Sequence, residues 1–125
     1  MAAATLTSMP VAQRVNNRLY QGMPAQAAVR IVGKFSEAAE ATEHQRTLTP
    51  TDGGAISVLA PEGQGAAFFK ADAGFVEVLG QKSDTGSLTA MLVAPLGEQL
   101  DVELLDEAIQ MMHLPQLQKY YAPQQ

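Results

Sequence analysis

The sequence contains no cysteine, and basic side chains are scarce in it. The lack of cysteine excludes disulfides, thiolate nucleophiles and metal sites with cysteine ligands. Eight Lys and Arg residues stand against thirteen Asp and Glu residues, so the net charge is −5. A protein that grips nucleic-acid phosphates unaided normally carries a basic face. The few scattered cations therefore argue against strong binding of nucleic acid by this chain alone.

The sequence also lacks membrane and targeting signals. No apolar run approaches the roughly 20 residues that a membrane-spanning helix needs. The first nine residues, MAAATLTSM, have neither the basic start of a secretory signal nor the arginines of a transit peptide, and we interpret them as a disordered tail. We expect no membrane contact and a cytosolic or nuclear location. With 125 residues, of which 46% are hydrophobic and 17% charged, the chain fits one globular domain.

Short segments with alternating apolar residues predict β-strands. Four are clear, AAVRIVGKF (27–35), AISVLA (55–60), FVEVLGQ (75–81) and SLTAMLVA (87–94), and a fifth is expected around 44–48. The sequence KSDTG (82–86) predicts the turn of a hairpin, and Pro95 is expected to end the last strand. Residues 61–74, which include Gly63 and Gly65, predict a loop. Before the strands, helical spacing up to Gly22 predicts a short lead-in helix or turn.

The order of these segments predicts an all-β fold with one terminal helix. Five short strands in an open sheet would leave bare edges, so closure into a small barrel is expected. We therefore predict a five-stranded OB-fold barrel plus a C-terminal α-helix, and the strand pattern alone leaves an SH3-like barrel or a small sandwich open. The expected division is a tail at 1–9, the barrel with its lead-in helix at 10–97, an assembly helix at 98–114 and a tail at 115–125.

The terminal helix has the strongest pattern in the chain. In LDVELLDEAIQMMHLPQLQKYY (100–121), Asp101 is a suitable N-cap and Pro115 should end the helix near His113. Apolar residues cover about half of its circumference, which is wider than the roughly 100° stripe that docks a helix on one core. One seam consists of Val102, Leu105, Ile109 and Met112, and a second consists of Leu104, Ala108 and Met111.

Two adjacent apolar seams fit a helix that lies between two neighbours, as in a helix bundle. The alternative is a helix buried so deeply on its own barrel that both seams are covered. The remaining face carries Asp101, Glu103, Asp106 and Glu107, which we interpret as a solvated surface and not as a metal site.

Catalytic chemistry has little support in the sequence. Neither His44 nor His113 has a ligand or a nucleophile at a diagnostic spacing. The glycine-containing turns EGQG, TDGG and DTG are not followed by the lysine and helix of a phosphate-binding loop. We therefore expect no enzyme activity, no cofactor and no metal.

Single-stranded nucleic acid is the other ligand to consider, because small barrels bind it with aromatic platforms among basic residues. The chain has no tryptophan, and the second and third predicted strands contain no aromatic residue. The weak candidates are two loop phenylalanines that could stack on a base and three cations that could contact phosphate: Phe68, Phe69, Arg30, Lys34 and Arg46. A stand-alone OB-fold module that binds single strands is thus an alternative to an assembly subunit.

Several stretches resemble the family of the smallest subunit of replication protein A, a heterotrimer that coats single-stranded DNA. RVNNRLYQGM (14–23) resembles the family's lead-in, RIVGKF (30–35) its first strand and FVEVLGQ its fourth. The most specific similarity is DVELLDEAIQMMHLPQLQKYY (101–121), which resembles the terminal helix. The sequence departs from the family at 44–54, and at Leu104 and Leu105, where an aromatic residue is common.

The resemblance implies an OB-fold whose terminal helix joins helices of two larger OB-fold subunits in a three-helix bundle. It implies a nuclear, mainly architectural role in replication, repair and recombination, with single-stranded DNA bound mainly through the partners. The small subunit of a related telomere-end complex is the alternative. The implied partner-interface residues are Leu105, Ala108, Ile109 and Met112, flanked by Val102, Leu104 and Met111.

Overall fold

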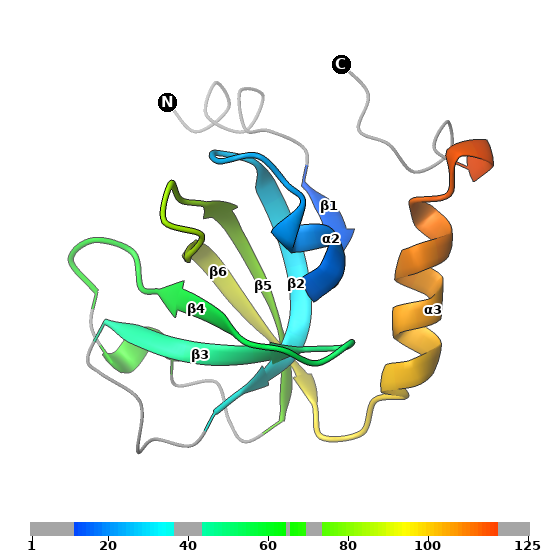
Figure 1. The fold of residues 1–125 in the computed structure, drawn as a ribbon. Helices are drawn as coiled ribbons and strands as arrows, with labels where there is room; N and C mark the ends of the chain where they lie inside the picture. Colours follow the sequence, from blue (N-terminus) through cyan, green and yellow to red (C-terminus); the bar gives the residue numbers. More distant parts are fainter. Residues whose placement is uncertain (1–11, 37–43, 65, 70–73, 118–125) are drawn as a thin grey trace, which may run out of the picture.

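The computed structural model describes residues 12–36, 44–64, 66–69 and 74–117, arranged as a barrel with a helix at its side (Figure 1). The predicted tail at 1–9 lies outside the described residues, as does most of the predicted tail at 115–125. The strands are β1 (Gln13–Val15), β2 (Ala28–Phe35), β3 (Gln45–Pro50), β4 (Ile56–Leu59), β5 (Phe75–Lys82) and β6 (Leu88–Gly97). The α-helices are α2 (Asn17–Gln21) and α3 (Val102–Met112), with 3-10 turns η2 (Ala66–Phe69) and η3 (Pro115–Leu117). No helix in these ranges is long and apolar enough to cross a membrane.

The strands close on themselves, as an OB-fold requires. The sheet has the order β1-β2-β3-β4-β6-β5, and an additional antiparallel pairing of β2 with β5 completes the ring. β4 and β6 join in parallel where Val58 and Leu59 face Leu88 and Thr89. The predicted OB-fold barrel with a C-terminal helix is confirmed, and its five strands are β2 to β6.

The interior of the barrel follows the alternation seen in the sequence. Val29 and Ile31 of β2 are fully buried, and so are Val76 and Val78 of β5, which lie across the β2–β5 ladder. Phe69 of η2 joins the same core and is 1% exposed. Full burial of each large apolar side chain contributes about 1.5–3 kcal/mol, so this core is the main source of stability.

Two details of the sequence-based assignment were wrong. β6 does not end before Pro95 but continues to Gly97. Pro95 lies opposite Val76, next to an irregularity in the register between Phe75 and Val76, and a bulge tolerates a residue that has no N–H to donate. The lead-in is also not helical throughout, because Val15 belongs to β1 and only α2, which ends at Gly22 as expected, is helix.

β2 and β3 approach each other closely at Gly33. A Cβ atom at this position would overlap the carbonyl oxygen of Thr49. We expect Gly33→Ala to lower the free energy of unfolding by roughly 1–3 kcal/mol, because two paired backbones would have to separate. Urea denaturation measures the change. Gly22→Ala is the matched control, since a Cβ at Gly22 meets its nearest atom at 3.6 Å, and an equal loss of stability in both variants would contradict the close approach.

Candidate partner-binding helix

The boundaries of α3 are set by residues at its two ends. Asp101 caps the start, where its Oδ1 accepts a hydrogen bond from the Leu104 backbone N–H at 3.0 Å. At the other end the His113 N–H donates to the Gln110 carbonyl at 3.1 Å, and Pro115 begins the 3-10 turn η3. The N-cap at Asp101 and the end of the helix at His113 therefore agree with the sequence-based prediction.

One face of α3 docks on the barrel through an apolar residue between two polar ones. Ile109 is 0% exposed, whereas no other residue of the helix is fully buried. Three residues before it, Asp106 Oδ1 accepts hydrogen bonds from Asn16 Nδ2 at 3.0 Å and from Thr51 Oγ1 at 2.8 Å. Four residues after it, His113 Nε2 lies 2.9 Å from the Arg14 carbonyl oxygen, which can only accept. These three residues share one helical face and hold it against the barrel.

Asn16 joins this docking site to the barrel. It is only 1% exposed and lies between β1 and α2. Its Oδ1 caps α2 by accepting from the Leu19 N–H at 3.0 Å, which leaves its amide nitrogen for Asp106. The Asn16 side chain thus caps α2 and also anchors α3 to the barrel.

The hydrogen bonds at Asp106 also change its acidity. Burial is the largest single influence and by itself raises the pKa of Asp106. Hydrogen bonds from Asn16, Thr51 and Gln110, together with the positive charge of Arg18, outweigh it and lower the pKa below the ordinary value of 3.8. Our interpretation of Asp106 as part of a solvated face was therefore wrong. The sequence could have indicated that Asp106 faces the barrel, because it lies three residues before Ile109 on the apolar side of the helix.

The opposite face of α3 leaves large apolar side chains in solvent. Leu104 is 62% exposed and Met111 is 55% exposed, and Leu114, just beyond the helix, is 39% exposed. We call these three residues the outer row. In Figure 1, α3 stands beside β1, and no other described element covers its far side. The apolar surface of the helix thus exceeds what its own barrel covers.

The predicted interface residues divide according to these two faces. Ile109 is covered by the barrel, so its side chain is not available to another protein in this arrangement. Leu104 and Met111 are open to solvent, and Leu114 is an exposed residue that our sequence analysis missed. The other four predicted residues are half-buried: Val102, Leu105, Ala108 and Met112. Their contact with partners stays a prediction.

The structure does not gather the predicted nucleic-acid residues into one surface. Lys34 is exposed on the outer side of β2, with its Nζ 4.8 Å from the centre of the Phe75 ring. Arg46 is on the same side of β3 as the buried Leu48, so it faces the barrel end and lies 5.8 Å from the Phe69 ring. Exposed Arg30 lies on the outer side of β2 with Lys34. The cations therefore occupy two faces of the sheet.

The loop phenylalanines close the end of the barrel. Phe69 is buried and meets both Phe35 and Phe68 edge to face, with ring centres 5.4 Å apart in each pair. The base-stacking role considered for Phe69 is therefore wrong for this conformation, because its ring has no free face. Phe68 is half-buried against the same core, and its contact with a base stays a prediction.

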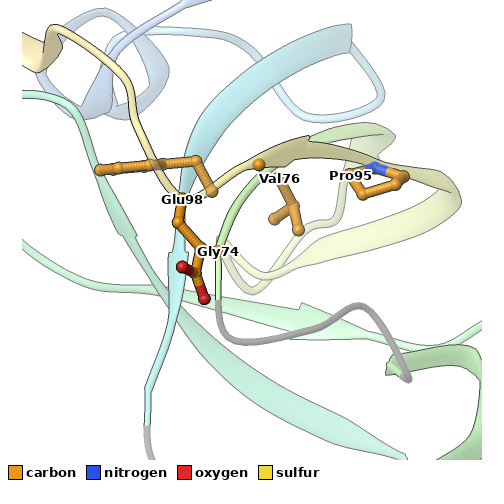
Figure 2. Close-up of a pocket in the computed structure, with 6 residues that line it drawn as sticks. Gly74, Val76, Pro95 and Glu98 are labelled. Atoms are coloured by element: carbon orange, nitrogen blue, oxygen red, sulfur yellow. The ribbon is translucent and has the colours of Figure 1, made fainter.

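A second feature is a pocket of about 220 Å³ at the open end of β5 and β6 (Figure 2). Among the described residues that line it, Glu98, where the chain leaves β6 toward α3, is the acidic one. Within the described ranges there is no group of three or more metal-binding side chains, here or elsewhere. The pocket therefore offers neither a paired acid and base nor a ligand set.

Comparisons with known proteins agree with this architecture. The sequence model described as Replication factor A protein 3 matches residues 8–118. The chain belongs to this family. A search of curated proteins gave no match.

Two solved structures are similar to the chain in fold. One is the structure of U. maydis replication protein A bound to ssDNA, with 22% identity and a TM-score of 0.65 over 80% of this chain and 87% of that chain. The other is the crystal structure of the S. pombe Stn1-ten1 complex, with 9% identity and a TM-score of 0.60 over 83% of this chain and 93% of that chain.

The network at Asp106 predicts a pH dependence. Because the folded pKa is lower than the unfolded one, the stabilisation is fully present above 3.8 and is lost as the pH falls through the folded value. We expect the urea midpoint of the native chain to fall as the pH is lowered from about 6 to about 3. In Asp106→Asn the midpoint should be lower at pH 6 and should change less with pH. Identical pH profiles for the two proteins would contradict the role of this carboxylate.

Proposed function

We propose that this chain is a non-catalytic assembly subunit of a replication protein A heterotrimer. In this proposal α3 joins one helix from each of two larger OB-fold subunits in a three-helix bundle. The observation that carries it is the outer row, Leu104, Met111 and Leu114, exposed on a helix whose opposite face is already docked. Exposed apolar side chains in a row on a helix are typical of a protein-protein contact.

In the same proposal, single-stranded DNA is bound mainly through the partners. The net charge of −5 and the separation of Lys34 from Arg46 support a weak contribution from this barrel. The solved U. maydis complex, to which this chain is similar in fold, is a replication protein A bound to ssDNA. Action in replication, repair and recombination, and a nuclear location, follow from the family and are part of the proposal.

The outer row gives a direct test by mutation. We expect Leu104→Asp and Met111→Asp each to weaken recovery of the two larger subunits by roughly 30-fold or more, because a charge would replace a central apolar contact. The measurement is co-purification of the full chain with its partners from the source cells, quantified over a concentration series. Both side chains are exposed, so the variants should fold as the native chain does.

Leu92→Asp is the matched control. Leu92 is 56% exposed but lies on β6 and not on α3, so the same substitution there should leave recovery of the partners unchanged. Equal recovery with the native chain, Leu104→Asp and Met111→Asp would refute the proposal.

Binding of single-stranded DNA separates the assembly subunit from a stand-alone module. We expect the isolated chain to show no sub-micromolar binding to a fluorescent oligo(dT) strand in anisotropy measurements, because Arg30, Lys34 and Arg46 do not lie on one face. The purified complex, measured with the same strand, is the positive control. Tight binding by the isolated chain that weakens with added salt would favour the stand-alone module.

The similarity to the S. pombe Stn1-ten1 complex supports a second candidate, the small subunit of a telomere-end complex. Both candidates use the same fold and the same helix, so the partners themselves distinguish them. Mass spectrometry of the proteins that co-purify with the chain decides between the two.

A further inference from the structure

The C-terminal part of the outer row, Met111 and Leu114, borders a hollow. Glu107, Gln110, Met111 and Leu114 line this hollow of about 360 Å³, which is open to solvent. Their spacing is i, i+3, i+4 and i+7, which is the set of four residues that receives one side chain in knobs-into-holes packing. Leu114 keeps its place after the end of α3 because its N–H donates to the Met111 carbonyl at 3.1 Å. The hollow therefore has the form of a site for one side chain from a neighbouring helix.

The walls of this hollow differ in chemistry. Met111 and Leu114 present apolar surface. Gln110 is held in place, because its Nε2 donates to Asp106 Oδ2 at 2.7 Å. Glu107 is exposed, and no described lysine, arginine or histidine lies within ion-pair distance of it. The hollow is thus apolar on one side and carries an unpaired carboxylate on the other.

The surroundings of Glu107 are acidic as well. The chain between residues 98 and 117 contains no lysine or arginine, whereas it carries Glu98, Asp101, Glu103, Asp106 and Glu107. A leucine inserted into the hollow would cover Glu107 in part without pairing its charge, and that costs free energy. A long side chain with an alkyl stem and a cationic head would instead pack its stem on Met111 and Leu114 and pair its head with Glu107.

We propose that this hollow receives a lysine or arginine side chain from a helix of a partner subunit. This inference rests on the proposed function, because a partner helix must lie along α3 for the side chain to enter. The inference also predicts the sequence of the partner helix. The apolar seam of that helix should contain one lysine or arginine at the level of Met111. Burial of the outer row favours association with the partner helix. The hollow determines which type of partner residue can lie against Glu107.

The test compares two isosteric changes that remove the same charge from the same helix. In the full complex with its two larger subunits, Glu107→Gln should weaken assembly roughly five- to twenty-fold at low salt. Glu103→Gln removes an exposed carboxylate one turn earlier, outside the hollow, and should change affinity by less than about twofold. The difference between the two variants should shrink as salt rises from about 0.05 M to about 0.5 M.

A double-mutant cycle identifies the inserted residue. Each lysine and arginine of the partner helices is replaced by methionine and combined with Glu107→Gln and, separately, with Glu103→Gln. We expect one partner cation to couple with Glu107 and not with Glu103. If no partner cation couples with Glu107, or if both glutamates behave alike, the inference is wrong. In that case the effect of Leu104→Asp on assembly shows whether the proposed function survives without it.

Discussion

The position of α3 depends on the hydrogen bonds of one carboxylate. Asp106 accepts from Asn16, which precedes α2, and from Thr51, which follows β3, so two distant parts of the barrel meet at a single helical residue. Both bonds form only when the helix is rotated to one setting. Ile109 then fills the space beneath the helix, and Leu104 and Met111 are turned to solvent. Which residues a partner can reach is therefore decided inside this subunit.

Local pattern was sufficient to predict most of the barrel, because the alternation of Val29 and Ile31 or of Val76 and Val78 reports burial directly. Features that depend on distant residues were not predictable. The three-residue strand β1 exists only through its parallel pairing with β2, and its own sequence has no strand signal. The continuation of β6 past Pro95 depends on the irregular register opposite Val76.

The same limit applies to α3. The sequence indicated that α3 has too much apolar surface for one neighbour, but its two seams are similar in composition. Asn16 and Thr51 bind Asp106 and thereby turn the seam that contains Ile109 toward the barrel. They lie about 90 and 55 positions from Asp106 along the chain. Leu114 escaped prediction because the turn after His113 carries the apolar row beyond the end of the helix.

The contact between His113 and the Arg14 carbonyl matters before any partner is present. In the described sheet, β1 pairs with β2 alone, so its other edge is a row of backbone groups that could template the addition of a strand from another molecule. The end of α3 occupies that edge through His113. The end of α3 therefore shields this edge against the addition of a strand, although Leu104 and Met111 of the same helix stay exposed.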